Sequence, residues 1–442
     1  MRSVIQERAR RLLTPNISEK RRKKKIADMT LKLVEASSSK LDIVTGVELG
    51  GLYAKNTWLV GADIDIFVKV EKNVSDEKFT KLVLDIGYTS MKKYKPYVRF
   101  AEHPYVEAVV QGTRVNVVGC YDVKIGDWHS AADRSQYHTT FMKKHLTSKK
   151  QQDVRLLKAF LKSNMIYGAE IAKEGFSGYV SEVLIWNLGN FSNVIKKMAT
   201  IKENEIIGDT SLKFKTPIVI IDPVDNNRNL AAAISTENLV KFVLASRKYL
   251  KKPTHSSFAN KKTMKPNGNL DDCLVVQFSF KSRSPEIIWG QSKRTATSLS
   301  RQLIMAGFNP LQNMVIINQG VVYMLFALQS MDINKNMIKN GPTIYGGDHV
   351  QKFINKNFKT SISMWINSSG NVLSLHKRDA THAGKFLNDS LKNNLYAMGV
   401  SKGIQNDIKQ FKVILGRQVK NKLIKKALYE FVSVDEAFFS KY

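Results

Sequence analysis

Hydrophobic and polar residues repeat with two different periods along the first half of the chain. Residues 45 to 123 alternate short apolar runs with turn residues, which predicts β-strands. Within them, Tyr105 to Gln111 and Val115 to Gly119 are expected to pair as a hairpin that turns at Gly112-Thr113-Arg114. From Asp153 to about Phe191 the period becomes helical. A sheet followed by helices is therefore predicted.

The second half of the chain combines strands with one long helix. Pro217 to Ile221 is predicted to be a buried strand that ends in the turn Asp222-Pro223-Val224-Asp225. Residues 250 to 272 are rich in Lys, Pro, Asn and Ser and are expected to form a linker or loop. The elements expected beyond it are strands at 274–278, 287–289, 314–317 and 321–328 and a helix at 292–305. A sheet with a helix packed across it indicates the α+β class.

Two local signals mark helices. Ser177, within Gly175-Phe176-Ser177-Gly178, is expected to cap the helix that follows it. The basic run Lys20 to Lys25 precedes an apolar-periodic stretch and predicts an amphipathic helix with a basic start. Such a run is usually a solvated face, and it is also a candidate contact for RNA.

The candidate chemistry lies where a glycine pair precedes a strand with two aspartates. Gly50-Gly51 opens a turn into a short helical piece, and Asp63 and Asp65 are two positions apart in the next strand. Residues i and i+2 of a strand point to the same face, so these carboxylates project together and suit Mg²⁺. Glycines let the backbone approach a phosphate closely. The pair of motifs predicts nucleotidyl transfer from a triphosphate, whereas the Asp-Ile-Asp-Ile alternation alone is also typical of an ordinary half-exposed strand.

Size and charge narrow the class of partner. A chain of 442 residues, 43% of them hydrophobic, is expected to fold into two to four domains. The formal net charge of +31 implies a large anionic partner, and nucleic acid is the natural candidate because each neutralised phosphate releases a counterion.

A membrane is the rival partner, but the sequence has no apolar run of spanning length. The nearest run, Met314 to Leu328, is interrupted by Asn318-Gln319-Gly320. The amino terminus has charges without an apolar stretch behind them, so no signal peptide is expected. Cys120 and Cys273 are the two cysteines, which favours a reducing cytoplasm over a disulfide or zinc framework.

These motifs carry a resemblance to one family over nearly the whole chain. The matching segments are Tyr53-Ala54-Lys55-Asn56-Thr57-Trp58-Leu59, Ala101-Glu102-His103-Pro104-Tyr105-Val106, Arg155-Leu156-Leu157-Lys158, Tyr167-Gly168-Ala169-Glu170, Gly175-Phe176-Ser177-Gly178-Tyr179, Asp222-Pro223-Val224-Asp225 and Trp289-Gly290-Gln291-Ser292-Lys293-Arg294. In this order and spacing they resemble the archaeal, class I, CCA-adding enzymes, which are tRNA nucleotidyltransferases.

The resemblance implies a fold, an activity and partners. It implies a polymerase-β-like nucleotidyltransferase head with an amino-terminal helix at 1–145, a mainly helical central domain at 146–272 and a carboxy-terminal α+β tRNA-binding region at 273–442. The activity implied is addition of C, C and A to the 3′ end of tRNA from CTP and ATP, with Mg²⁺ as cofactor and the tRNA acceptor arm as partner. It leaves open whether the chain forms a homodimer.

The resemblance also implies roles for individual residues. Asp63 and Asp65 match two of the family's metal carboxylates, and Asn116 stands where the family has the third. The residues that match nucleotide-binding positions are Gly51, Leu52, Lys55, Ser135, His138, Lys158, Tyr167 and Arg228, the last of them at the position that helps to choose the base. Taken alone, each of these side chains is more often a packing or solvated residue.

Two positions depart from the family pattern inside the implied site. Leu52 replaces the usual serine of the phosphate turn, so only backbone N–H groups remain there. Asn116 brings no charge and cannot accept a proton from an attacking hydroxyl. Glu107 is a candidate replacement: with Gly112-Thr113 at the centre of the hairpin, Val109 would face Asn116, and Glu107 would lie about 7 Å away diagonally on the same face.

Three functions follow from these observations. The leading hypothesis is a CCA-adding enzyme with an atypical metal site. The second is a degenerate relative that binds tRNA or nucleotide without transfer, motivated by Leu52 and Asn116. The third is a related template-independent transferase such as a poly(A) polymerase, against which the similarity beyond Trp289-Gly290-Gln291 argues.

Overall fold

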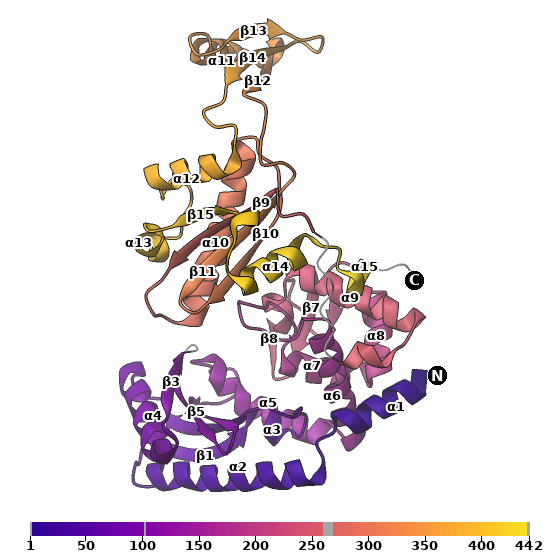
Figure 1. Ribbon diagram of the computed structural model, residues 1–442. Helices are drawn as coiled ribbons and strands as arrows, with labels where there is room; N and C mark the ends of the chain where they lie inside the picture. Colours follow the sequence, from indigo (N-terminus) through magenta and orange to yellow (C-terminus); the bar gives the residue numbers. More distant parts are fainter. Residues whose placement is uncertain (1, 101–102, 260–267, 440–442) are drawn as a thin grey trace. The chain divides into compact units, whose positions relative to one another are not determined.

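The structure is a computed structural model that describes residues 2–100, 103–259 and 268–439. The chain forms two compact units (Figure 1). The first comprises residues 1–263, 284–286 and 435–442, and the second comprises residues 264–283 and 287–434. Each unit has its own buried cores, and both combine helices with sheets, so the α+β prediction is confirmed.

The first unit begins with a five-stranded sheet in the order β1-β2-β5-β4-β3. Its strands are β1 (Val44–Gly50), β2 (Ile64–Glu71), β3 (Tyr97–Phe100), β4 (Pro104–Val110) and β5 (Thr113–Asp122). β2 and β5 are parallel, and the other neighbours are antiparallel. Every second residue of β2 from Ile64 to Val70 is fully buried, so Asp65 and its alternate neighbours face the other side.

Two capped helices cover the buried face of this sheet (Figure 1). They are α2 (Ile17–Ser38) and α4 (Asp76–Met91), capped by Asn16 and Ser75, whose side chains accept backbone N–H bonds. The predicted basic helix is therefore confirmed as α2. Its Lys23 is buried and lies over the Trp58 ring at 4.5 Å, so the basic run is not solvated throughout.

The predicted β4–β5 hairpin forms, but its turn lies one residue earlier than expected. Val110 pairs with Thr113, so Gln111 and Gly112 are the central residues, and both have positive φ, 48° and 73°. Such values suit a tight two-residue turn that follows the twist of the strands. The prediction that Val109 faces Asn116 is therefore wrong: Val109 pairs with Arg114.

The rest of the first unit is mainly helical. The helices are α1 (Arg2–Leu13), α3 (Gly51–Ala54), α5 (Arg134–His145), α6 (Ser148–Ser163), α7 (Gly178–Leu188), α8 (Phe191–Ala199), α9 (Thr236–Lys251) and α15 (Glu436–Phe439). The expected helical period covers α6 and α7, and Ser177 caps α7 by accepting the Val180 N–H at 3.0 Å, as predicted. Buried apolar faces of α6 to α9 share one core.

A small sheet completes this unit. It consists of β6 (Glu205–Ile207), β7 (Ile218–Asp222) and β8 (Asp225–Asn229), and the predicted buried strand is confirmed as β7. Asp222 pairs with Asp225 across the expected turn. Part of the expected loop at 250–272 is helical, because α9 extends to Lys251 and a 3₁₀ turn covers His255–Phe258; residues 260–267 lie outside the described part.

The second unit is built on a four-stranded sheet in the order β10-β11-β9-β15. The strands are β9 (Cys273–Ser279), β10 (Pro310–Asn318), β11 (Val321–Leu328) and β15 (Lys412–Leu415), which confirms the strands expected at 274–278, 314–317 and 321–328. α10 (Pro285–Met305) packs its buried side chains into the same core.

The strand expected at 287–289 is wrong, because these residues form the first turn of α10. Pro285 begins the helix, where its missing N–H has no intrahelical partner to lose. Ile288 is buried and Ile287 is half exposed, as a helix turn of period 3.6 requires. Three consecutive apolar residues are too few to distinguish this from a strand.

The second unit also contains a three-stranded sheet and several further helices. They are β12 (Asn336–Thr343), β13 (Ser363–Ile366), β14 (Asn371–Lys377), α11 (Asp348–Asn357), α12 (Ala383–Asn393), α13 (Gln405–Ile408) and α14 (Lys422–Val432). The described residues of both units also contain the 3₁₀ helices η1 (Lys92–Tyr94), η2 (Ala131–Asp133), η3 (Leu230–Ala233), η4 (His255–Phe258), η5 (Ile344–Gly346), η6 (Lys402–Ile404) and η7 (Gly416–Gln418). Within the described ranges, none of the helices combines the length and apolarity needed to cross a membrane.

Close packing of α4 on the sheet gives a test of the fold. A Cβ added at Gly87 would lie 2.6 Å from the Val106 Cβ, so Gly87→Ala is expected to lower the free energy of unfolding by about 1–3 kcal/mol despite the better helix propensity of alanine. The control is Gly46→Ala, whose Cβ would meet its nearest atom, on Lys69, at 3.7 Å. Urea unfolding measures both, and equal stability of the two variants would contradict this packing.

Candidate active site

One row of side chains crosses the solvent-facing side of the five-stranded sheet. Asp65 pairs with Gly50 on one side and with Asn116 on the other, and Asn116 pairs in turn with Glu107. Directly opposed residues of neighbouring strands point to the same face. Glu107 therefore lies opposite Asn116 rather than diagonal to it, and the row ends at its partner Tyr97 on β3.

The carboxylates of Asp63 and Asp65 each have a donor from β5. The Arg114 Nε donates to Asp63 Oδ1 at 2.7 Å, and the Asn116 Nδ2 donates to Asp65 Oδ1 at 2.8 Å. Burial raises the pKa of Asp65, the Asn116 amide opposes this, and the nearby charge of Asp63 raises the pKa further. The two carboxylates are thus close enough to repel each other.

The glycine turn lies against the Asp65 carboxylate. Gly51 has φ 61°, and a Cβ there would lie 1.9 Å from Asp65 Oδ2, so only glycine fits. Gly51 begins α3, the short helical piece that the sequence predicts. Leu52 packs its methyl groups toward Gly178 at the start of α7, where an added Cβ would lie 2.9 Å from Leu52 Cδ2. The turn therefore offers backbone groups beside the carboxylates.

The donor set of this row fits a hard cation. The described residues contain no group of three or more His, Cys, Asp or Glu side chains arranged to hold a metal. However, the Asn116 Oδ1 is buried and has no hydrogen-bond partner among them. Because a buried polar atom without a partner costs free energy, this oxygen suits a ligand that Asp63 and Asp65 would also bind.

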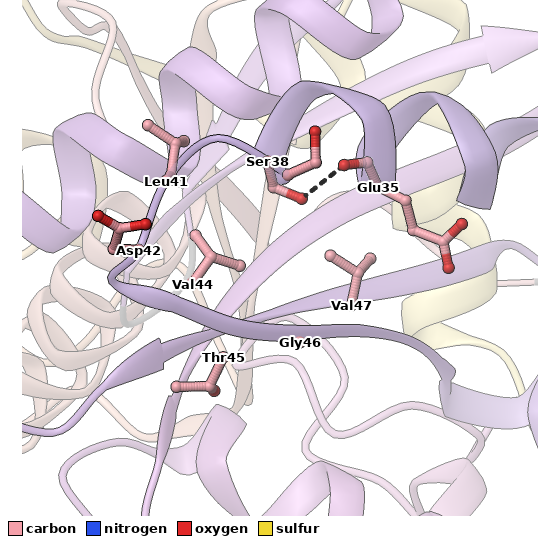
Figure 2. Close-up of a pocket in the computed structure, with 9 residues that line it drawn as sticks. Glu35, Ser38, Leu41, Asp42, Val44, Thr45, Gly46 and Val47 are labelled. Carbon is pink, nitrogen blue, oxygen red and sulfur yellow. Dashed lines mark hydrogen bonds between the residues drawn. The ribbon is translucent and has the colours of Figure 1, made fainter.

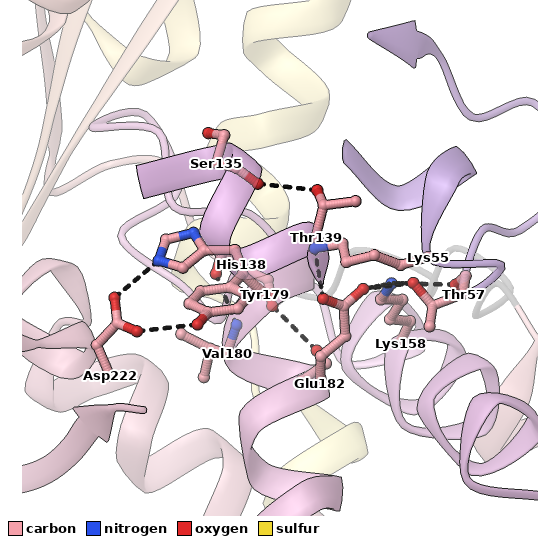
Figure 3. A network of polar contacts seen from close by, with 12 residues as sticks. Lys55, Thr57, Ser135, His138, Thr139, Lys158, Tyr179, Val180, Glu182 and Asp222 are labelled. Carbon is pink, nitrogen blue, oxygen red and sulfur yellow. Dashed lines mark hydrogen bonds and ion pairs between the residues drawn. The ribbon is translucent and has the colours of Figure 1, made fainter. Parts of the chain in front are cut away.

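A buried network around Glu182 joins the glycine-turn segment to the helices (Figure 3). The Glu182 carboxylate pairs with Lys55 Nζ at 2.5 Å and with Lys158 Nζ at 3.4 Å, and it accepts a hydrogen bond from the Thr57 hydroxyl. Lys158 also donates to the carbonyl of Thr57 at 3.0 Å. All four side chains are buried.

Burial and charge act in opposite directions in this network. Burial lowers the pKa of Lys158 to about 7, although Glu182 opposes the shift. Burial would raise the pKa of Glu182, but Lys55 and Lys158 outweigh it, so its pKa is lowered and the carboxylate stays ionised. Lys55 and Lys158, both expected to bind nucleotide, thus contact Glu182, and Lys158 also contacts Thr57.

Arg155 on α6 holds the same segment through its backbone. Its Nε donates to the Trp58 carbonyl at 3.1 Å, and its Nη2 donates to the Asn56 carbonyl at 2.5 Å. Burial lowers the pKa of Arg155 to about 10, which leaves it charged at neutral pH. Residues 55–58 are therefore fixed by three side chains from α6 and α7.

A second buried carboxylate, Asp222, collects the other predicted residues (Figure 3). It accepts hydrogen bonds from His138 Nε2 at 2.9 Å, the Tyr179 hydroxyl at 2.9 Å and Arg228 Nη1 at 3.1 Å. The backbone N–H of Val224 donates at 3.0 Å. The His138 and Tyr179 rings stack with centroids 3.9 Å apart. The structure thus brings His138 and Arg228 together through Asp222.

The protonation of this cluster follows from its contacts. Burial lowers the pKa of His138, although Asp222 opposes this, so the imidazole is neutral at neutral pH and donates its Nε2–H to the carboxylate. Burial would raise the pKa of Asp222, but the donors outweigh it and the pKa is lowered. Tyr179 has a raised pKa, chiefly because it is buried, and remains a donor.

Ser135 and Tyr167 lie at the edges of these clusters. Ser135 is one turn before His138 on α5, and its carbonyl accepts a bond from the Thr139 hydroxyl at 2.8 Å. Tyr167 lies beneath Lys162, whose Nζ is 5.1 Å from the ring centroid. Burial raises the pKa of Tyr167, which keeps its hydroxyl protonated. Its hydroxyl lies near Gly178, as Leu52 does.

Sequence analysis missed Glu182 and the part that Asp222 has in the cluster. Glu182 is the single acid in the apolar helix α7, and Asp222 ends the apolar strand β7. A lone carboxylate in an apolar run is rarely buried without a cationic or hydrogen-bonding partner, so this pattern is the signal that could have found both.

A separate cavity of about 330 Å³ lies between the end of α2 and β1 (Figure 2). It is lined by Glu35, Ser38, Ser39, Leu41, Asp42, Val44, Thr45, Gly46 and Val47. None of the predicted site residues lines it, so it is distinct from the carboxylate row.

Comparison with known proteins agrees with this geometry. A family model described as a nucleotidyltransferase domain matches residues 31–144, which contain the glycine turn and the carboxylate row. The fold and site thus define a nucleotidyltransferase. Two further models match in order: the second domain of tRNA nucleotidyltransferase at residues 152–259, and the carboxy-terminal domain of CCA-adding enzyme at residues 271–423.

Individual relatives identify the family. The CCA-adding enzyme of Pyrobaculum islandicum is 33% identical over 366 residues, which are 80% of this chain and 86% of that protein. The enzyme of the same name from Saccharolobus solfataricus is 32% identical over 85% of this chain and 89% of its own length. The chain belongs to the CCA-adding enzyme family, and the resemblance derived from the sequence is confirmed.

The Glu182 network predicts a large effect of removing one charge. Glu182→Gln keeps the shape but leaves the buried ammonium group of Lys55, and that of Lys158 where it is protonated, without a counter-charge, so the free energy of unfolding is expected to fall by about 3–5 kcal/mol. Urea unfolding followed by tryptophan fluorescence measures the loss, with the exposed Glu203→Gln as the matched control. Adding Lys158→Met should recover part of the loss, and an equal loss with and without it would contradict the network.

Proposed function

We propose that this protein adds C, C and A to the 3′ end of tRNA from CTP and ATP by Mg²⁺-dependent nucleotidyl transfer. The observation that carries the proposal is the match of residues 271–423 to the CCA-adding carboxy-terminal domain, in the chain that holds the carboxylate row. That match also favours CCA addition over a poly(A)-polymerase-like activity.

The metal would be held by side chains of β2, of the residue just before it, and of β5. Asp63, Asp65 and the Asn116 Oδ1 supply oxygen donors of the kind that Mg²⁺ binds. When bound, Mg²⁺ supplies positive charge that activates the tRNA 3′ hydroxyl and screens the triphosphate. Asp65 would be one ligand, with its Oδ2 facing Gly51, and Arg114 balances part of the negative charge of Asp63 through their ion pair.

The glycine turn and the Asp222 cluster would hold the nucleotide. Backbone N–H groups of Gly51 and Leu52 are offered to phosphate beside the carboxylates. Ser135 and His138 lie on one face of α5, where they would contact phosphate, with the ring of His138 fixed by Asp222 and Tyr179. Tyr167 would contact the sugar.

Arg228 is the proposed base-selecting residue. One nitrogen is held by Asp222, and 36% of the side chain is exposed, so its other N–H groups can reach a base. C and A share an amino group beside a ring-nitrogen acceptor, whereas U and G present a carbonyl there. A fixed donor set accepts C or A, because a mismatched base leaves buried polar groups unpaired.

Lys55 and Lys158 would act by position rather than by contact with the triphosphate. Both ammonium groups are buried against Glu182, and Lys158 also binds the Thr57 carbonyl. They fix the segment that follows the glycine turn, so the turn is held in place before nucleotide binds.

The remaining proposals concern domains, tRNA and compartment. We divide the chain into a head at 1–145, a helical central domain at 146–272 and a tRNA-binding region at 273–442, which would hold the acceptor arm. The net charge of +31 supports binding of a polyanion. Free, buried Cys120 and Cys273 support a cytoplasmic location.

Nucleotide incorporation tests the activity directly. Purified protein with Mg²⁺, labelled CTP or ATP and tRNA lacking its 3′ CCA is expected to incorporate C, C and A. Asp65→Asn should lower the rate by at least about 100-fold, because it removes a charge that stabilises the reaction. The control Asp122→Asn makes the same change at an exposed end of β5. No incorporation by the natural sequence beside a working family member would exclude the activity.

Salt dependence tests the basic surface. If the protein contacts six to ten tRNA phosphates, its affinity for tRNA is expected to fall by roughly 10³–10⁵-fold between about 50 and 200 mM salt. Filter binding at several salt concentrations measures this fall. CTP, measured in the same buffers, has few charges and should weaken much less. A flat response for tRNA would mean that the excess of Lys and Arg serves another purpose.

A further inference from the structure

The carboxylate row contains one acid that the proposed mechanism does not use. Glu107 on β4 pairs directly with Asn116, which pairs with Asp65, so the three side chains lie side by side on one face. The Glu107 side chain is only 5% exposed. A carboxylate is seldom buried unless a cation or a hydrogen-bond donor contacts it.

One end of Glu107 is already held. Its Oε1 accepts a hydrogen bond from the Tyr97 hydroxyl and lies 3.6 Å from Arg99 Nη2. Within residues 2–100, 103–259 and 268–439 its Oε2 has no hydrogen-bond or ion-pair partner. The side chain is thus fixed by β3 on one side, while its second oxygen remains available to a ligand.

The amide of Asn116 gives an independent indication of a ligand between the acids. A carboxylate only accepts hydrogen bonds, so the Asn116 Nδ2 must face Asp65, and Oδ1 is the end turned away from it. This Oδ1 is buried and has no partner in the described residues. An oxygen in that state, flanked by two carboxylates, suits a cation.

The spacing favours a glutamate at this position. Asp65 and Glu107 are separated by two strand spacings, roughly 10 Å between backbones. A cation bound at about 2.1 Å by each acid can join them only if the side chains together span the rest. Glutamate is one carbon longer than aspartate, and that carbon provides the reach.

We propose that Glu107 supplies the third carboxylate of the metal site, from the strand next to the one that holds Asn116. The inference rests on the proposed function, since it assigns a ligand to the cation of that reaction. Asn116 then contributes its carbonyl oxygen between the two acids, and Tyr97 and Arg99 position Glu107. Glu107 on β4 thus supplies the negative charge that Asn116 on β5 lacks.

Metal affinity measured without tRNA or nucleotide tests the assignment. Mn²⁺ is titrated into the full chain and free Mn²⁺ is followed by electron paramagnetic resonance. Glu107→Gln is expected to weaken binding at least tenfold, and Glu107→Asp should also weaken it because the side chain is too short. Asn116→Asp should strengthen binding, and Glu107→Gln with Asn116→Asp should return to about the natural affinity, since the charge is restored on β5.

A matched control and a folding check keep the result interpretable. Glu48→Gln makes the same change on the same face of the sheet, where Glu48 pairs with Lys69 at 3.2 Å, and should leave Mn²⁺ binding unchanged. Thermal unfolding of each variant shows that it is folded, and Glu107→Asp and Asn116→Asp test the inference even if Glu107→Gln is unstable.

Two outcomes would overturn the assignment. Equal Mn²⁺ affinity of Glu107→Gln and Glu48→Gln would show that Glu107 is not a ligand, and so would the absence of any Mn²⁺ binding by the natural sequence. Because no tRNA is present, a Glu107-dependent metal site without CCA addition would instead refute the proposed function and leave the ligand assignment in place.

Discussion

The active-site arrangement depends on one buried carboxylate, that of Glu182. It receives two ammonium groups and a hydroxyl, and all of these groups are out of water. In such surroundings the charges interact strongly, and removal of the Glu182 carboxylate leaves buried positive charge uncompensated. The network ties α6 and α7 to residues 55–58, which directly follow the glycine turn. The position of the glycine turn beside the carboxylate row is therefore set by electrostatic contacts with α6 and α7 of the same unit.

Asp222 is a second buried carboxylate that is surrounded by hydrogen-bond donors, but it holds a different set of side chains. There a carboxylate collects four donors, and two of them, His138 and Arg228, belong to residues expected to meet the nucleotide. A donor that is held by a carboxylate loses little conformational freedom when a ligand binds, so recognition costs less entropy. One anchored carboxylate thus fixes the glycine turn, and another fixes the side chains that are proposed to contact the nucleotide. The chain has a net charge of +31, and these two buried acids hold its candidate site residues in place.

Much of the fold could be predicted because its signals are local. The strands β7, β9 and β11 are continuous apolar runs, and Ser177 caps α7 as its position suggests. The strand predicted at residues 287–289 is wrong because three consecutive apolar residues fit the period of a strand as well as that of a helix. The candidate metal pair could be named from spacing alone, but the Glu182 network could not. Its members come from three separate segments, and only the tertiary fold shows that Lys55 and Lys158 share one acid.

The exchange of an acid for an amide at position 116 becomes understandable from the row itself. Three adjacent carboxylates would repel one another on a partly buried surface, and each would raise the pKa of the next. With Asn116 in the middle, the amide donates to Asp65 and separates it from Glu107 by two strand spacings, which weakens the repulsion between the two outer acids. This arrangement leaves the buried Asn116 Oδ1 without a hydrogen-bond partner among the described residues. That costs free energy unless a ligand binds there. Such a site has less negative charge than a row of three carboxylates, and without a bound cation its side chains therefore repel one another less. If the row holds a metal as proposed, its affinity would depend on how far the Glu107 side chain can turn from Tyr97 toward Asn116.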